Sequence, residues 1–293
     1  MARVVVVHGI GQEFLGPESM GLEVGPALRD GLRLAGGPHL RPEDVACAFY
    51  GNLYFEAGTR SLDLPPWDET DVEDGLEAEL LEAWWEQAAQ VEPEILGPDA
   101  TGTRGAVGFG ASRLLLSERV RAALDALSAS RFFAKVSDRL LIFALKQVRR
   151  YMTDPELRSE AQTRIAEEIT DETRVLVAHS LGSVVAYEAL CAHPDWPVTD
   201  FVTLGSPLGM RSVVFDRLQP RPTDGTGAWP GSVARWTNVA DRGDIVALAD
   251  HLAPRFGGRV QDVSISNGMR MHDLLRYLTA TSTGRAVARG LEG

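Results

Sequence analysis

The hydrophobic positions of this chain form short continuous runs that alternate with longer helical patterns. The first run, Val4–Val7, is entirely β-branched and stops abruptly at a histidine and a glycine, which predicts a strand buried on both faces of a parallel sheet. Further short runs followed by turn residues predict strands at 44–53, 174–178, 200–204, 235–239 and 260–266. Helical patterns occupy 21–34, 156–169, 181–191 and 273–289. Strands that alternate with helices predict an α/β fold with a mostly parallel central sheet.

The segment 61–154 breaks this alternation, because it contains helical patterns and no convincing strand. One apolar series recurs there at helical spacing, namely Leu76, Leu80, Trp84, Ala88 and Val91. A second series follows it, namely Phe133, Val136, Leu140, Phe143 and Tyr151. Such stripes are typical of helices that pack against a core. We therefore expect a core formed by residues 1–60 and 155–293, interrupted by a helical insertion at 61–154.

A glycine-rich connector, Gly102 to Gly110, lies between the two stripes. A nucleotide-binding loop would need a strand before it and the full G-x-G-x-x-G spacing, and the connector has neither. We therefore interpret it as a flexible hinge.

The composition excludes several classes of protein. The chain has 293 residues, a formal net charge of −12 and two cysteines, Cys47 and Cys191. This argues against nucleic acid as the main partner and against a disulfide framework. The longest stretch without a charged residue, 175–187, is shorter than the roughly 20 residues of a membrane helix. The N-terminal valine run is too short for the apolar core of a signal peptide. We expect a soluble, cytoplasmic protein.

The charge is distributed unevenly over the insertion. Residues 61–103 contain thirteen acidic residues and no lysine or arginine, whereas 112–151 contain nine basic residues and three acids. The two segments could pack together, or each could form a solvated face. Alternatively, six cations could form a rim that contacts anionic lipids or substrates, namely Arg131, Lys135, Arg139, Lys146, Arg149 and Arg150. The sequence leaves both explanations open.

The strongest chemical signal surrounds Ser180, in the order apolar strand, tight turn, helix. A serine that projects from such a turn needs a strained backbone and small residues two positions before and after it, where this chain has Ala178 and Gly182. The segment resembles the nucleophile elbow of the α/β-hydrolase family, specifically its lipases and esterases, with alanine where glycine is more common. Ser206 also follows a predicted strand, but the next residue is Pro207, which has no N–H to offer an oxyanion hole.

The resemblance implies an α/β-hydrolase fold in which Val4–Val7 corresponds to the third strand of the family. The chain then has no room for the first strands, so the sheet is trimmed at one edge. The resemblance also implies that the insertion is a lid or cap, and that the nucleophile, the acid and the histidine follow one another along the chain.

Two carboxylates compete for the role of the acid. Asp244, followed by isoleucine and valine, resembles the acid of the D-I-V segment of lipases. Asp241 lies closer to the end of the predicted strand and is expected to tie down the turn, by capping or by pairing with Arg242. We favour Asp244.

The base is assigned to His272, which follows the last predicted strand and precedes the C-terminal helix, where the family places its histidine. His251 is the competitor, and we expect it in a helix as a surface or packing residue. His179 adjoins the nucleophile, and we expect its side chain to point away from the Ser180 hydroxyl.

The resemblance also implies an oxyanion hole made by two backbone N–H groups. One belongs to Leu181, directly after the nucleophile, and the other to Ile10 in the H-G loop after the first strand, with Gln12 as a reinforcing side chain.

The sequence therefore predicts a serine hydrolase that cleaves carboxylic esters through an acyl-enzyme on Ser180, with Asp244 and His272 completing a triad. The substrate is expected to be a small-molecule or lipid-like acyl ester. No cofactor or metal is expected, because the six histidines show no metal-ligand pairing. A thioesterase, an amidase or an acyltransferase would need the same triad, and a non-catalytic binding module on the same fold remains the alternative from another class.

Overall fold

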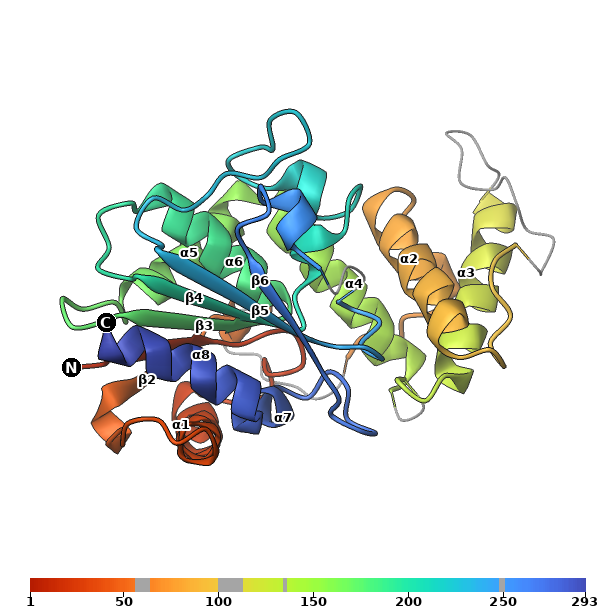
Figure 1. Cartoon of the computed structure of the whole chain (residues 1–293). Helices are drawn as coiled ribbons and strands as arrows, with labels where there is room; N and C mark the ends of the chain where they lie inside the picture. Colours follow the sequence, from red (N-terminus) through yellow and green to blue (C-terminus); the bar gives the residue numbers. More distant parts are fainter. Residues whose placement is uncertain (56–63, 100–112, 134–135, 248–250) are drawn as a thin grey trace. The chain divides into compact units, whose positions relative to one another are not determined.

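A computed structural model describes residues 1–55, 64–99, 113–133, 136–247 and 251–293 (Figure 1). The chain divides into two compact units, one made of Met1–Thr59 with Asp154–Gly293 and the other of Arg60–Thr153. These limits lie within one residue of those expected from the hydrophobic pattern. Lys135 and the connector from Gly102 to Gly110 fall outside the described residues.

The first unit contains a six-stranded sheet in which every strand pair is parallel (Figure 1). Its strands are β1 (Val4–Val7), β2 (Val45–Ala48), β3 (Val175–His179), β4 (Asp200–Leu204), β5 (Arg235–Asp241) and β6 (Gln261–Ile265), in the spatial order β2-β1-β3-β4-β5-β6. The predicted α/β class and the parallel sheet are thus confirmed. Because the strands are parallel, their carboxyl ends lie on the same side of the sheet. The loops after β1, β3, β5 and β6 therefore lie on that side.

Helices cover both faces of this sheet (Figure 1), which explains why the central strands β1 and β3 are nearly continuous apolar runs. On one face lie α1 (Pro17–Leu34), α7 (Leu274–Thr279) and α8 (Thr281–Glu292), and on the other α5 (Pro155–Ala166) and α6 (Leu181–Ala192). The core of the first face joins Leu28 and Val287 to the strand residues Val6 and Val177, all of them fully buried.

The helix predicted over 273–289 is two helices, because Ala280 has an extended backbone with ψ 133°. The break allows both α7 and α8 to pack closely on α1. A Cβ atom at Gly31 would lie 2.1 Å from the carbonyl oxygen of Leu278 in α7, and a Cβ atom at Gly284 of α8 would lie 2.1 Å from the carbonyl oxygen of Gly31. One straight helix could not make both contacts.

The strand predicted over 44–53 is also shorter than expected. It ends at Ala48, and a short 3-10 helix, η2 (Gly51–Tyr54), occupies the rest of the segment. There, a Cβ atom at Gly51 would lie 2.7 Å from the Cα atom of Glu13, so the chain turns where the loop after β1 crosses it.

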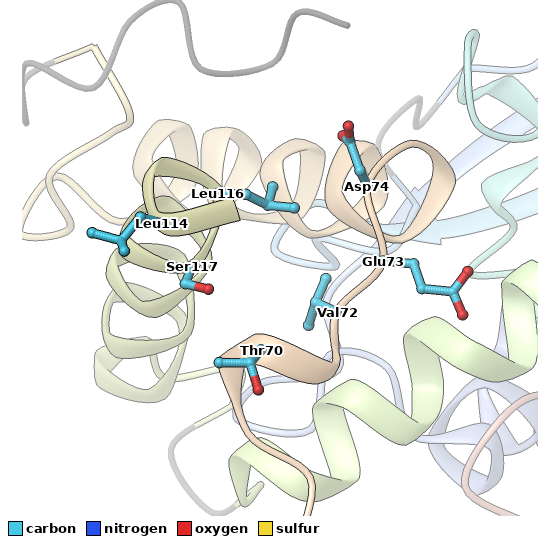
Figure 2. Close-up of a pocket in the computed structure, with 7 residues that line it drawn as sticks. All are labelled: Thr70, Val72, Glu73, Asp74, Leu114, Leu116 and Ser117. Carbon is cyan, nitrogen blue, oxygen red and sulfur yellow. The ribbon is translucent and has the colours of Figure 1, made fainter. Parts of the chain in front are cut away.

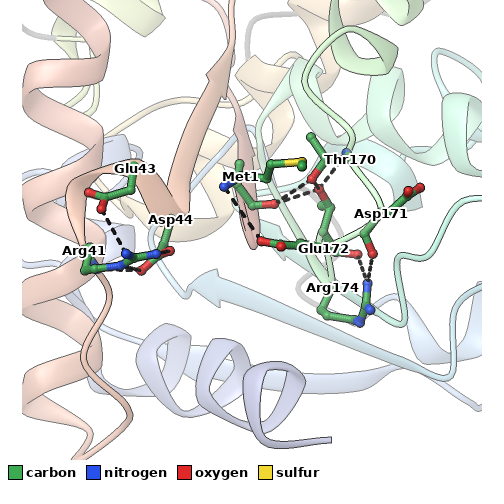
Figure 3. A network of polar contacts seen from close by, with 10 residues as sticks. Met1, Arg41, Glu43, Asp44, Thr170, Asp171, Glu172 and Arg174 are labelled. Carbon is green, nitrogen blue, oxygen red and sulfur yellow. Dashed lines mark hydrogen bonds and ion pairs between the residues drawn. The ribbon is translucent and has the colours of Figure 1, made fainter.

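The amino ends of the first three strands are held by polar contacts (Figure 3). The Arg41 guanidinium binds the Asp44 carboxylate, with Nη2 2.9 Å from Oδ1, and this hydrogen bond lowers the pKa of Asp44 to about 2. The N-terminal amine lies 3.7 Å from the Glu172 carboxylate, and Arg174 donates to the Asp171 carbonyl. These polar contacts lie at the amino ends of the strands, whereas the loops after β1, β3, β5 and β6 lie at the carboxyl ends.

Among its described residues, the second unit is helical. It contains α2 (Leu76–Val91), α3 (Arg113–Ala129), α4 (Asp138–Thr153) and a short 3-10 helix, η3 (Glu69–Asp71). The first predicted stripe lies on α2, where Leu76, Leu80, Trp84 and Ala88 are buried. The second stripe is partly wrong, because Leu140 is 39% exposed, while its neighbours Leu141 and Ile142 are buried. The apolar face of α4 therefore starts one position later than the spacing suggested.

The acidic and basic segments of the second unit are joined by ion pairs. The Glu77 carboxylate is fully buried and lies 2.7 Å from Arg149 Nε and 3.4 Å from Lys146 Nζ. The Arg131 guanidinium lies 2.8 Å from the Glu94 carboxylate. These contacts favour packing of the two segments as the reason for their opposite charges, and they leave Arg131, Lys146 and Arg149 with partners inside the unit.

Candidate active site

Ser180 lies in a strained turn between β3 and α6. Its backbone has φ 52° and ψ −132°, a region that non-glycine residues rarely adopt. The chain must turn tightly here, since a Cβ atom at Gly182 would lie 2.0 Å from the His8 carbonyl oxygen. Ala178 is fully buried. Gly182 is therefore a steric requirement of the turn.

The structure brings Ser180, His272 and Asp244 together, although they are far apart in the sequence. The Ser180 hydroxyl oxygen lies 2.9 Å from His272 Nε2, and His272 Nδ1 lies 2.7 Å from Asp244 Oδ2. The Asp244 carboxylate is completely buried, whereas the His272 side chain is 20% exposed. Because an ionised carboxylate only accepts hydrogen bonds, we assign the imidazole proton to Nδ1 and leave Nε2 to accept from the serine.

The two candidate acids occupy different positions. Asp244 faces His272, and its other oxygen, Oδ1, accepts from the backbone N–H groups of Val246 at 3.0 Å and Ala247 at 3.4 Å. Within the described residues, the Asp241 carboxylate contacts only backbone, accepting from the N–H of Gly243 at 2.8 Å and from the N–H of Asn267. Asp241 thus ties the loop after β5 to the loop after β6.

His251, the competing base, lies elsewhere on the first unit. Its side chain is 60% exposed and its Nδ1 atom is 4.0 Å from the Asp262 carboxylate. The helix predicted around it is wrong at this residue, which lies in no helix, and the next helical turn of the described chain, η6, begins at Ala253.

His179 is buried behind the histidine that contacts Ser180. The rings of His179 and His272 lie 4.5 Å apart, and neither nitrogen of His179 meets a hydrogen-bond partner among the described residues. Burial, together with the nearby His272 ring, holds the pKa of His179 well below its usual value. A neutral imidazole therefore forms one wall beside His272.

The loop after β1 runs directly beside Ser180. A Cβ atom at Gly9 would lie 2.5 Å from the Cβ atom of Ser180, so the loop can pass only because this residue is glycine. The N–H groups of Ile10 and Leu181 have no acceptor among the described residues. The side chain of Gln12, expected as a reinforcement, makes no hydrogen bond within the described part of the chain.

His8 fixes the start of this loop. The Tyr50 N–H donates to His8 Nε2 at 3.1 Å, so the proton of the ring is on Nδ1, which donates to the Gly9 carbonyl at 2.7 Å. The Tyr50 hydroxyl donates to the His8 carbonyl at 2.9 Å. Burial lowers the pKa of His8 to about 4, so the ring is neutral at pH 7.

Stability should therefore depend on the protonation of His8. The unfolded histidine takes up a proton near pH 6.5 and the folded one only near pH 4, so stability is complete above pH 6.5 and is lost as the pH falls toward 4. The loss amounts to about 3 kcal/mol. Urea unfolding at several pH values should show a shallower decline for His8→Phe than for the wild type. The exposed His39, changed to asparagine, is the control, and an equal slope in the wild type and His8→Phe would contradict the assignment.

Three residues of the site were not identified from the sequence. Tyr277 donates its hydroxyl proton to Asp244 Oδ2 at 2.7 Å. Glu13 accepts from the Gly11 N–H at 2.7 Å and so shapes the loop after β1. Gly205 has φ 52°, and a Cβ atom there would lie 2.6 Å from Asp244 Oδ2 and 3.0 Å from His272 Nδ1. Of the three, only Gly205 carried a usable signal, as a glycine directly after a predicted strand.

A hollow of about 720 Å³ in the second unit offers no comparable chemistry (Figure 2). Its described lining includes two carboxylates, from Glu73 and Asp74, and two hydroxyls, from Thr70 and Ser117. Glu73 pairs with Arg149, and Asp74 accepts from the Gly75 N–H. No histidine lines the hollow among the described residues, so Ser117 has no base there.

The described residues contain no cluster of three or more histidine, cysteine, aspartate or glutamate side chains placed to hold a metal ion. No helix in the described part of the chain is long and apolar enough to cross a membrane. Comparison of the chain with protein-family models, with curated proteins and with solved structures gave no match.

Proposed function

We propose that this protein is a serine hydrolase of the α/β-hydrolase type that cleaves carboxylic esters through an acyl-enzyme on Ser180. One observation carries the proposal, namely the continuous hydrogen-bonded chain from Ser180 Oγ through His272 to the buried Asp244 carboxylate. A serine hydroxyl is a weak nucleophile at neutral pH, and this arrangement is the one that activates it. The trimmed sheet and the lid role of the second unit belong to the same proposal.

In the acylation step, the Ser180 oxygen attacks the carbonyl carbon of the ester while its proton passes to His272 Nε2 over the 2.9 Å hydrogen bond. The carbonyl oxygen becomes negative in the tetrahedral intermediate. His272, now doubly protonated, is stabilised by Asp244 and gives the proton to the leaving alkoxide as the C–O bond breaks. The products are the alcohol and an ester between the acyl group and Ser180.

In the deacylation step, water takes the place of the alcohol. His272 accepts a proton from the water as its oxygen attacks the acyl carbon, and the proton then passes to the Ser180 oxygen as the acid leaves. Asp244 keeps the Nδ1 proton of His272 in place throughout, so Nε2 is always the atom that exchanges protons.

The negative oxygen of each tetrahedral intermediate needs donors that are already in position. The N–H of Leu181 begins α6, where helix N–H groups have no acceptor within the helix. The N–H of Ile10 lies in the loop that Gly9 brings against the serine, and His8 and Glu13 hold the residues on either side of it. Both N–H groups are free of acceptors among the described residues, as donors to a transient oxyanion must be.

The substrate in this proposal is a small-molecule or lipid-like acyl ester, and the reaction uses no cofactor. A panel of p-nitrophenyl esters of increasing chain length would identify the preferred acyl group. The same triad would serve a thioester or an amide, so the panel should include one of each.

A fluorophosphonate probe separates an enzyme from a binding module that keeps the fold. The probe phosphonylates only an activated serine, so the wild type should be labelled and Ser180→Ala should not. Ser206→Ala is the matched control, because Ser206 also follows a strand and its hydroxyl contacts the Ser183 hydroxyl at 2.6 Å instead of a histidine. Labelling that is lost in Ser206→Ala and kept in Ser180→Ala would overturn the assignment of the nucleophile.

A further inference from the structure

The hydroxyl of Tyr277 sits at the junction of the two aspartates and of the histidine that contacts Ser180. It donates to Asp244 Oδ2 at 2.7 Å and accepts from the Asp241 N–H at 2.8 Å. Asp244 Oδ2 is also the atom that binds His272 Nδ1. The tyrosine and the histidine therefore share a single carboxylate oxygen, and the tyrosine is completely buried.

Both of these donors lie in one short segment, His272 just before helix α7 and Tyr277 within it. His272 directly precedes Asp273, the N-cap of α7, and Tyr277 lies one turn into that helix. The Asp273 carboxylate accepts from the Arg276 N–H at 3.0 Å, and the Asp273 carbonyl accepts from the Tyr277 N–H at 3.1 Å. Because α7 is capped in this way, the positions of His272 and Tyr277 relative to each other are fixed as the helix forms.

The direction of the hydrogen bond is also fixed. Burial and the neighbouring Asp244 carboxylate raise the pKa of Tyr277 far above its usual value, so the hydroxyl keeps its proton. Its oxygen already accepts from the Asp241 N–H, so the proton is directed at Asp244. The titratable groups that face the tyrosine are Asp241, Asp244 and the neutral His179, whose ring lies 5.8 Å away, with His272 beyond the shared oxygen.

We propose that Tyr277 is a positioning residue for the triad, which rests on the serine hydrolase function proposed above. Its hydroxyl fixes Asp244 Oδ2 in line with His272 Nδ1 and takes up part of the negative charge of that oxygen. A carboxylate that shares its charge between two donors holds a proton on the imidazole less tightly. Tyr277 thereby holds in place the carboxylate oxygen that accepts the Nδ1 proton of His272.

The test compares Tyr277→Phe with Tyr187→Phe. Tyr187 is an equally buried tyrosine of the first unit, and its hydroxyl donates to the Ala228 carbonyl at 2.8 Å, away from the triad. Each variant loses one hydroxyl from a buried site, so their thermal unfolding should change to a similar extent. Only Tyr277→Phe should lower kcat for a p-nitrophenyl ester, by about tenfold with KM nearly unchanged.

A second readout does not require turnover. The titration of the His272 ring can be followed by proton NMR and assigned by its loss in His272→Gln. In Tyr277→Phe its midpoint should rise by about half a pH unit, because a proton on the pair is held more tightly, and the acidic limb of kcat/KM should rise with it. Tyr187→Phe should titrate as the wild type does.

The possible results are distinct. If the wild type turns over esters and Tyr277→Phe keeps the kcat and the His272 titration of the wild type, the positioning role is wrong and the hydrolase function stands. Equal changes in Tyr187→Phe would also overturn it, since a general loss of packing would then be the cause. If the wild type is neither active nor labelled by a fluorophosphonate, the proposed function fails, and the His272 titration still decides whether Tyr277 acts on the pair.

Discussion

Replacing Asp244 with asparagine is expected to lower kcat by about 10⁴-fold. Asp244 Oδ1 accepts two backbone N–H groups, so the amide oxygen of asparagine will keep that place and the amide nitrogen will replace Oδ2. An NH₂ group there donates to His272 Nδ1 and forces the imidazole proton onto Nε2. The Ser180 hydroxyl then has no acceptor for its proton.

The matched control is Asp241→Asn. Asp241 lies three residues away, and in the described part of the chain its carboxylate contacts only the backbone N–H groups of Gly243 and Asn267. Its replacement should lower the unfolding temperature and reduce kcat by less than about tenfold, since the tautomer of His272 is unaffected. The measurement is kcat for one p-nitrophenyl ester in the wild type and both variants. A larger loss in Asp241→Asn than in Asp244→Asn would show that the acid has been assigned to the wrong residue.

The second large effect is expected for Gly182→Ala. The added Cβ atom would lie 2.0 Å from the His8 carbonyl oxygen, 2.8 Å from its carbon and 3.1 Å from the Val7 carbonyl oxygen. These are backbone atoms, and the Tyr50 hydroxyl and the His8 ring hold them in place. Either β1 or the first turn of α6 must move, which we expect to cost about 3 kcal/mol and to displace Ser180 from His272.

Gly21→Ala is the control for this substitution. Gly21 lies in α1, and a Cβ atom there would meet nothing within 4 Å. Alanine in an open helical position should stabilise the protein by about 0.5–1 kcal/mol. Urea unfolding and ester turnover would be measured for both variants. The steric account of the elbow is contradicted if Gly182→Ala keeps the stability and activity of the wild type.

The strands at the centre of the sheet could be predicted because they are buried on both faces. Val4–Val7 and Asp200–Leu204 have the same limits in the sequence pattern and in the structure, and each is fully buried. The edge strand β2 was predicted too long because the apolar pattern continues beyond Ala48. The chain turns at Gly51, where a Cβ atom would lie 2.7 Å from the Cα atom of Glu13. The C-terminal helix was predicted as one piece because the hydrophobic pattern does not show where the helix breaks. The break lets α7 and α8 pack closely on α1, at Gly31 and Gly284.

The site could be predicted only where chemistry follows chain order. Ser180 has a local signal in its small neighbours, and the chain order of the family that this segment resembles pointed to Asp244 and His272. Tyr277 could be identified only from the structure, and the sequence signal of Gly205, a glycine after a predicted strand, did not show what it contacts. The tyrosine reaches an aspartate 33 residues away in the sequence, and the glycine leaves room for an aspartate and a histidine from two other loops. Contacts of this kind leave no periodicity or motif in a single sequence.

The position of a fluorophosphonate adduct tests the central claim most directly. The intact wild-type protein should gain the mass of one adduct at pH 7, and peptide mapping should place it on Ser180. Labelling should be much slower in Asp244→Asn, because the histidine then holds its proton on the nitrogen that faces the serine. An adduct on any other residue, or a folded wild-type protein that takes up no adduct, would contradict the proposal that Ser180 is an activated nucleophile.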